Sequence, residues 1–248
     1  MTPDQALELL LRFISGAATD SLGESEWLQL ISVARQQTVT GLLYKAAENL
    51  PPGTKISERV LFTLMSEVNV IVNHNLKLGE VEKEVLGILT GGGLHPVVMK
   101  GSTCAARYPS PELRTGGDVD LYLDKDEFPK AVELILAAGI ESDSRPDGSV
   151  EFTRNGCEVE LHRQYFDLHV RESVLPPVGT PEAELVMLSA HILKHACGVG
   201  IGLRQIIDFA LAYKAYPGDF DALQAIFRRC GISRWNTLLL SFLLQISH

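Results

Sequence analysis

The sequence predicts an α+β protein in which a small mixed β-sheet lies between helical segments. Three observations lead to this prediction. Apolar residues recur at helical spacing before residue 90 and again after residue 176. Strand-like alternation and a strong hairpin signal are confined to the stretch between them. We therefore divide the chain into a helical segment at 1–90, a β-rich core at 91–175 and a helical segment at 176–248.

The longest predicted helix runs from about residue 57 to residue 89. Ser57 is a suitable N-cap, and the glycines at 91–93 would end the helix. The apolar run at 238–246 is far shorter than the ~20 residues that a membrane-spanning helix needs, so we expect a buried helix there. Because the chain stops on this run, extension of the natural protein beyond His248 is a hypothesis that the gene length would test.

The composition is that of an ordinary globular protein. Hydrophobic residues make up 46% and charged residues 21% of the 248 positions, which excludes wholesale disorder. The formal net charge of −9 argues against broad binding to a nucleic-acid backbone. The four cysteines are scattered singly, and the acidic, amphipathic stretch at 1–13 does not have the pattern of a signal peptide. We therefore expect a cytoplasmic protein with reduced thiols and no membrane partner.

Two aspartates carry the first chemical signal. Residues 118–123 alternate with a period of two, so Asp118 and Asp120 share one face of a predicted strand. Two carboxylates this close repel each other unless a cation lies between them, and oxygen ligands suit Mg²⁺. The same repulsion predicts that Asn at either position leaves the metal-free protein no less stable. A solvated edge strand with two surface aspartates is the alternative interpretation.

A hairpin is predicted at residues 149–163. Asn155 and Gly156 lie between two alternating runs, which is typical of a two-residue type I′ turn. Such a turn fixes the register so that Phe152 faces Val159. One face of the hairpin is then apolar, and the other carries the polar residues Glu151, Glu158, Glu160 and His162. If the apolar faces of the hairpin and of the Asp118 strand cover the same helices, the hairpin adds a third carboxylate to the aspartate pair.

The order of these motifs resembles the nucleotidyltransferase superfamily. That superfamily has a glycine followed by Gly or Ser, then D-x-[DE], then a third acid on a later strand. Here Gly101-Ser102, Asp118-x-Asp120 and Glu160 follow in that order. With Arg114, a Leu-Arg-x-x-x-Asp helix and a helical N-terminal segment, the chain looks most similar to a bacterial family of uncharacterised nucleotidyltransferases. The resemblance covers roughly residues 95–215.

The resemblance implies transfer of a nucleoside monophosphate from an NTP to an acceptor hydroxyl. Asp118 and Asp120 would be catalytic metal ligands, and Glu160 would be a third ligand that helps to activate the hydroxyl. The cofactor would be Mg²⁺, as two ions, with Mn²⁺ able to substitute. The expected nucleotide-binding residues are Lys100, Gly101, Ser102, Arg114 and Arg204.

Some assignments stay open at this point. Glu158 shares a strand face with Glu160 and could replace it, and Arg107 is a weaker candidate for binding the triphosphate. We expect the cleft to lie between the sheet and the C-terminal helices. The sequence does not identify the acceptor, but the acidic net charge favours a small molecule or a protein over RNA.

Several polar residues carry weaker signals. His191 and His195 are four apart on a predicted helix, a spacing that can bind zinc, but no third ligand is evident beside them. His162 either orients the third acid, contacts phosphate or is structural. Arg204 and Asp208, also four apart, form a surface ion pair or face the cleft.

Two other function classes compete with the enzyme. A non-catalytic module of the same fold, of partner-binding or antitoxin type, predicts nucleotide binding without turnover. A helical scaffold with a purely structural hairpin predicts no metal-dependent stabilisation by an NTP.

Overall fold

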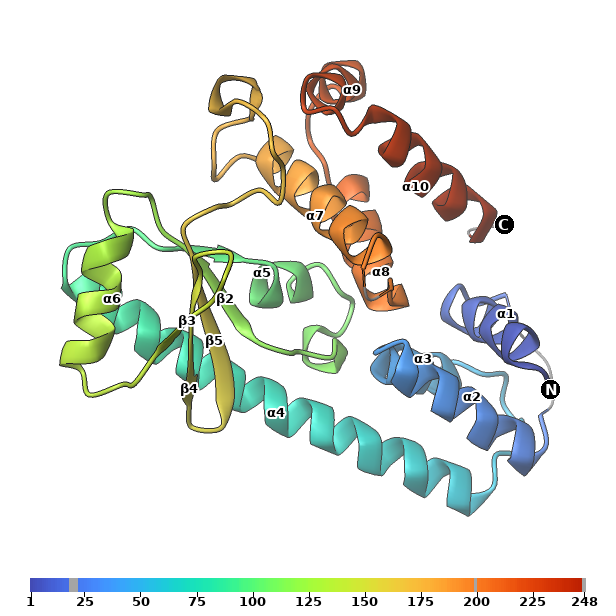
Figure 1. The fold of residues 1–248 in the computed structure, drawn as a ribbon. Helices are drawn as coiled ribbons and strands as arrows, with labels where there is room; N and C mark the ends of the chain where they lie inside the picture. Colours follow the sequence, from blue (N-terminus) through green and yellow to red (C-terminus); the bar gives the residue numbers. More distant parts are fainter. Residues whose placement is uncertain (18–21, 199, 247–248) are drawn as a thin grey trace.

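The computed structural model describes residues 1–17, 22–198 and 200–246. Within these residues ten α-helices surround one five-stranded sheet, which confirms the α+β fold (Figure 1). Four helices precede the sheet, and the last of them is by far the longest (Figure 1). Their bounds are α1 (Pro3–Ile14), α2 (Glu24–Gln36), α3 (Thr40–Glu48) and α4 (Glu58–Gly91).

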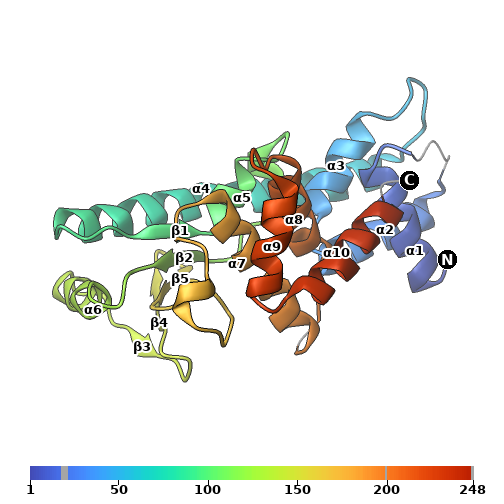
Figure 2. The ribbon, with the colours of Figure 1, turned by 90° about the horizontal axis from the view of Figure 1, so that it is seen from above.

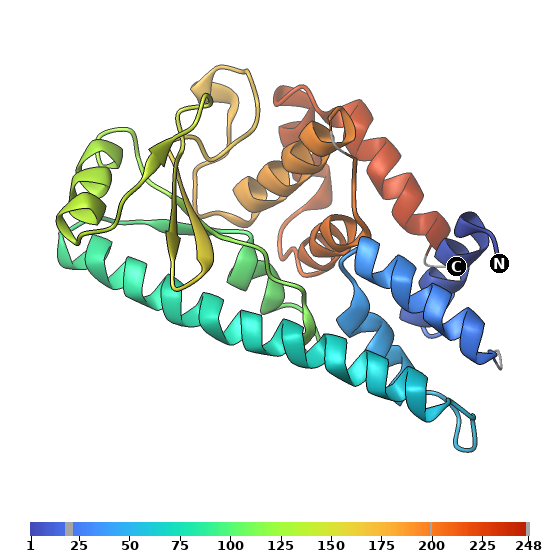
Figure 3. The same cartoon turned by 60° about the horizontal axis from the view of Figure 1, so that its bottom comes forward.

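The long helix α4 runs beneath both the sheet and the N-terminal helices (Figures 1 and 3). The Ser57 hydroxyl accepts a hydrogen bond from a backbone N–H in the first turn of α4, and the helix ends at Gly91. Both predicted ends are therefore confirmed. Leu64 packs among the N-terminal and C-terminal helices, whereas Val85 packs against the sheet. The helix therefore belongs to two buried clusters and fixes one relative to the other.

The sheet has the strand order β1-β2-β5-β4-β3. Strands β2 and β5 run parallel, and the other neighbouring pairs run antiparallel, so the sheet is mixed as predicted. The strands are β1 (Val97–Met99), β2 (Val119–Tyr122), β3 (Asp143–Ser144), β4 (Val150–Arg154) and β5 (Cys157–His162).

The hairpin of β4 and β5 has the predicted register, with Phe152 opposite Val159. Asn155 and Gly156 have φ angles of 51° and 76°, and a type I′ turn requires positive φ at both central residues. The apolar faces of β2, β4 and β5 pack in one cluster with α4 and α6 (Phe128–Ala137). The polar faces of these strands therefore lie together on the opposite side of the sheet.

Of the four C-terminal helices, the first two face that opposite side, and the last returns toward α1 (Figures 1 and 2). The four are α7 (Pro181–Ala196), α8 (Leu203–Lys214), α9 (Phe220–Arg229) and α10 (Ser233–Ile246). None of the helices in the described ranges combines the length and apolar character that a bilayer crossing requires.

The predicted burial of the last helix is wrong, although the helix itself is present. Leu238 is 66% exposed and Leu244 is 64% exposed, whereas Leu239 is buried. The helix lies at the surface and packs through one face. The apolar side chains on its other face are therefore exposed.

Helix α3 approaches the short 3₁₀ helix at Pro111–Leu113 through a glycine. A Cβ added at Gly41 would overlap with the Leu113 carbonyl oxygen, which is backbone and cannot rotate away. Gly41→Ala should therefore lower the free energy of unfolding by about 1–3 kcal/mol, measured by urea denaturation. Gly87→Ala in α4 is the control, since a Cβ there meets nothing within 4 Å. It should be neutral or stabilising by up to about 1 kcal/mol, and equal stability of the two variants would contradict the close approach.

Candidate active site

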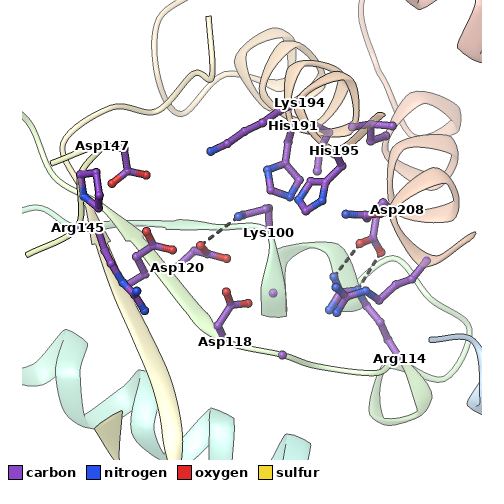
Figure 4. A pocket seen from close by; sticks show the side chains of 18 residues that line it. Lys100, Arg114, Asp118, Asp120, Arg145, Asp147, His191, Lys194, His195 and Asp208 are labelled. Atoms are coloured by element: carbon purple, nitrogen blue, oxygen red, sulfur yellow. Dashed lines mark hydrogen bonds and ion pairs between the residues drawn. The ribbon is translucent and has the colours of Figure 1, made fainter. Parts of the chain in front are cut away.

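A cavity of about 570 Å³ opens between the sheet and helices α7 and α8, where the cleft was expected (Figure 4). Its walls come from the ends of β1, β2 and β5, from the loop at 145–147 and from the two helices. Seven of the predicted site residues line it, namely Lys100, Gly101, Arg114, Asp118, Asp120, Glu160 and Arg204.

Asp120 is the buried centre of the acidic wall. It is 2% exposed and lies directly beside Glu160 on the neighbouring parallel strand. His162, two residues further along β5, places Nε2 2.8 Å from Asp120 Oδ1 and 3.5 Å from Glu160 Oε2. One ligand atom from each of the three residues lies within 4.8 Å of the others. This spacing is compatible with a shared metal ion.

Lys100 supplies the positive charge at this wall (Figure 4). Its Nζ lies 3.0 Å from Asp120 Oδ1. Lys100 has a φ of 52° and Gly101 a φ of 44°, so the chain turns sharply between β1 and α5 (Gly101–Ala105). Burial lowers the pKa of the Lys100 ammonium, but the carboxylates of Asp120 and Asp118 outweigh it and raise the pKa above its ordinary value.

The Asp120 carboxylate is stabilised in its ionised form. Burial alone would raise its pKa, but the hydrogen bond with His162 and the charge of Lys100 lower the pKa to about 2. Unrelieved repulsion between two aspartates, the premise of the sequence prediction about Asn substitutions, therefore does not hold for Asp120. Its charge is already balanced before any metal binds.

Asp118 is less constrained than Asp120. It lies one residue before β2, is half-buried and points into the cavity (Figure 4). Its carboxylate attracts Lys100, but within the described ranges no hydrogen bond or ion-pair contact holds it. Asp118 also stands apart from the three residues whose ligand atoms share one small volume. It is the freer of the two acids.

The segment that leads to Asp118 is anchored to α4. The Asn75 amide donates to the carbonyl oxygens of Glu112 and Arg114, both at 2.8 Å, and its oxygen accepts from the Gly116 N–H at 3.1 Å. A Cβ at Gly116 would lie 2.5 Å from both Asn75 Oδ1 and Leu78 Cδ1, so a larger residue there would displace the side chain that makes these hydrogen bonds. The anchor sets where the chain enters β2.

Helix α8 holds the same segment from the other side. Arg114 and Asp208 form a buried bidentate pair at 2.8 and 2.7 Å, and the Tyr108 hydroxyl donates to Asp208 at 2.8 Å. Of the two interpretations of Arg204 and Asp208, the surface ion pair is wrong, because Asp208 is buried and paired with Arg114. Arg204 lines the cavity and donates to the Thr115 carbonyl oxygen at 2.8 Å.

Several residues singled out in the sequence do not line this cavity, among them Ser102, Arg107 and Glu158. The Ser102 hydroxyl donates to both carboxylate oxygens of Glu82 in α4, at 2.9 and 2.8 Å. Arg107 forms a bidentate pair with Glu184 of α7 at 2.7 and 2.6 Å. Glu158 is exposed. The structure therefore brings Glu160, and not Glu158, to Asp120.

Other cavity residues had no signal in the sequence. Arg145 and Asp147 come from the loop between β3 and β4, and Lys194 comes from α7 (Figure 4). Ser149 donates to Glu160 at 2.5 Å and to Asp147 at 2.8 Å, which links that loop to the acidic wall. The Pro-Asp-Gly sequence at 146–148 indicates a turn, but nothing local says that the turn lies over the site.

The histidine pair of α7 also lines the cavity. The rings of His191 and His195 meet edge to face, with centroids 4.5 Å apart. His191 Nδ1 lies 3.4 Å from Asp167, which also pairs with Lys194 at 2.9 Å. Within the described ranges, the residues whose ligand atoms cluster closely enough to share a metal do not include this pair.

The mixed sheet, the in-register acids and the flanking helices agree with the nucleotidyltransferase-like class expected from the sequence. Comparison with family models narrows this class. A family described as uncharacterised nucleotidyltransferase matches residues 23–245, so the chain belongs to that family. The resemblance predicted from the sequence is confirmed. Comparisons with curated proteins and with solved structures give no match.

The two aspartates should respond differently to removal of their charge. Asp120→Asn leaves the Lys100 ammonium without its partner, so we expect it to lower the free energy of unfolding of the metal-free protein by on the order of 3 kcal/mol. Asp118→Asn, the matched control, should change it by less than about 0.5 kcal/mol. Urea denaturation in the presence of EDTA measures both. Equal effects would contradict the assignment of Lys100 to Asp120.

Low pH should lower the free energy of unfolding by protonating Asp120. The folded pKa of Asp120, about 2, lies below its ordinary value of 3.8. Its stabilising contribution is therefore complete above about pH 4 and is lost as the pH falls toward 2, a change on the order of 2 kcal/mol. Between pH 5 and pH 2 the wild type should lose more stability than Asp120→Asn. Parallel pH profiles of the two proteins would refute this assignment.

Proposed function

We propose that the protein catalyses Mg²⁺-dependent transfer of a nucleoside monophosphate from an NTP to an acceptor hydroxyl. One observation carries the proposal. Asp120 and Glu160 lie in register on neighbouring strands, on a wall of a cavity whose other walls hold Lys194 and Arg204. Acids on one wall and cations on another suit a triphosphate that carries a metal ion.

The acidic wall supports metal binding. Asp118, Asp120 and Glu160 supply carboxylate oxygens, which Mg²⁺ prefers and Mn²⁺ accepts. Bound divalent ions would neutralise the triphosphate and favour ionisation of the attacking hydroxyl. His162 would orient the Asp120 carboxylate, because Nε2 already lies at hydrogen-bond distance from it.

The cationic walls support nucleotide binding. If a metal ion replaced the Lys100 ammonium beside Asp120, the ammonium would be free to pair with a phosphate oxygen. Arg204 Nε is buried and, in the described part of the chain, has no hydrogen-bond partner. Such a group costs free energy unless a ligand supplies the acceptor. Gly101 and Gly117 leave the backbone open to close approach, whereas Arg114 is already neutralised by Asp208.

A second candidate is a nucleotide-binding module without catalysis, of partner-binding or antitoxin type. It is favoured by the Lys100 ammonium, which lies 3.0 Å from Asp120 where an ion would otherwise bind. It is also favoured by the Ser102 hydroxyl, which is engaged with Glu82 and not with the cavity. This candidate predicts NTP binding without release of pyrophosphate.

The third acid gives a sharp test of the catalytic proposal. Mg²⁺ and an NTP together should raise the melting temperature of the wild type. Glu160→Gln removes one metal-facing charge, so it should lose most of that increase and slow pyrophosphate release by on the order of 100-fold. Glu158→Gln is the control, because Glu158 lies two residues away on the same strand face but outside the cavity. It should behave as the wild type.

Each outcome separates the candidates. A Mg²⁺-dependent increase in melting temperature without pyrophosphate release, across hydroxyl acceptors, would favour the binding module. Identical behaviour of the two Gln variants, or no increase in the wild type, would contradict nucleotide binding at this wall.

A further inference from the structure

A second cavity, of about 380 Å³, shares a wall with the first. Residues of α4 contribute to its wall, whereas residues of α7 and α8 contribute to the wall of the first (Figure 4). Gly101, Arg114 and Asp118 line both cavities. Asp118 is thus an acid that can be approached from two sides, and its carboxylate is not held by a hydrogen bond within the described ranges.

The two cavities differ in charge. Among the described residues, the first is lined by five lysine and arginine side chains and two histidines, together with five carboxylates. In the second, the charged side chains are Glu82, Asp118 and Arg114, and the Arg114 guanidinium is neutralised by Asp208 in the buried pair. The rest of its wall is mainly apolar, with Leu78, Ala105, Ala106, Pro111 and Val119. The cavity near α4 is therefore apolar with a net acidic character.

Glu82 places a carboxylate at a fixed position in the wall of this cavity. Both of its carboxylate oxygens accept from the Ser102 hydroxyl, which holds the side chain in place. An ionised carboxylate offers about four acceptor positions, so Glu82 keeps capacity for an N–H or O–H of a ligand. An anionic group at the same place would meet Glu82 and Asp118, and the one cation among the described residues that line this cavity is already paired.

We propose that the cavity near α4 binds the acceptor, and that the acceptor is a small hydroxyl compound without negative charge that presents an amine or a second hydroxyl to Glu82. This inference rests on the proposed nucleotidyl transfer. The cavity volume of about 380 Å³ falls in the range of about 300–1,000 Å³ that small-molecule sites occupy. A phosphorylated compound or an RNA end would bring uncompensated negative charge to two acids.

The shared wall gives the reaction its geometry. The acceptor hydroxyl enters beside Asp118 from the α4 side, and the triphosphate lies in the larger cavity, beside Lys194 and Arg204. The hydroxyl oxygen forms a bond to the α-phosphorus, and the bond from that phosphorus to the oxygen bridging to the β-phosphate breaks. Pyrophosphate leaves with the electron pair, and the hydroxyl proton passes to solvent water.

A glycine of α4 allows the cavity to be filled without strain. Gly79 lines it, and a Cβ added there meets nothing within 4 Å. Gly79→Leu therefore places a side chain in the acceptor space and also favours the helix. Gly87→Leu is the matched control, because Gly87 is equally open on the same helix and lies outside this cavity.

The experiment measures the binding of small hydroxyl-containing fragments by saturation-transfer NMR. Mg²⁺ and a non-hydrolysable ATP analogue are present throughout. The fragments form three matched groups, neutral, amine-bearing and phosphate-bearing. Neutral and amine-bearing fragments should bind the wild type and Gly87→Leu, and lose affinity by at least about ten-fold in Gly79→Leu. Glu82→Gln should weaken the amine-bearing fragments by about five-fold more than the neutral ones. The increase in melting temperature with Mg²⁺ and ATP should be the same in Gly79→Leu and Gly87→Leu.

The inference is overturned if no neutral or amine-bearing fragment distinguishes Gly79→Leu from Gly87→Leu. It is also overturned if phosphate-bearing fragments bind this cavity, or if Gly79→Leu loses the response to Mg²⁺ and ATP. Failure of the proposed function is distinguishable, because it removes the ATP response from the wild type itself.

Discussion

The ion pair between Lys100 and Asp120 is the constraint around which the polar side of the sheet is built. A buried carboxylate costs several kcal/mol unless partners compensate it, and here an ammonium and an imidazole do so from either side. Lys100 follows β1, Asp120 lies on β2 and His162 ends β5, so the three partners tie three neighbouring strands together. The positive φ at Lys100 is unfavourable for the backbone, but it places the ammonium beside this carboxylate, and the ion pair offsets the cost.

The second support of the site is the segment that leads into β2. Helix α4 holds its backbone through Asn75, and helix α8 holds it through Asp208 and Arg204. The segment therefore connects the helices below the sheet to those above it. Asp118 lies where the supports end, which explains why one acid of the pair is free while Asp120 is fixed. This free acid lines both cavities.

Local chemistry explains what the sequence could predict. Asn155-Gly156 dictates a turn type and hence a register, Ser57 marks a helix start, and a period of two places Asp120 on the polar face. The long-range pairs could not be predicted. Arg114 pairs with Asp208 across 94 positions, and among 22 cationic and 31 acidic residues no local pattern selects that partner. For the same reason the sequence did not reveal that Ser102 turns toward α4, nor which face of α10 stays exposed.

The length of α4 has a consequence for how the molecule holds together. Its 34 residues span about 50 Å at 1.5 Å per residue. One end of α4 packs in the cluster formed by the N-terminal and C-terminal helices, and the other end packs against the sheet. Loss of packing in either cluster would therefore expose apolar side chains of α4. We infer that the helices at the N-terminus and the strands that carry the acids unfold as one cooperative unit. The separation between the N-terminal helices and the sheet is therefore set by a continuous helix and not by a linker.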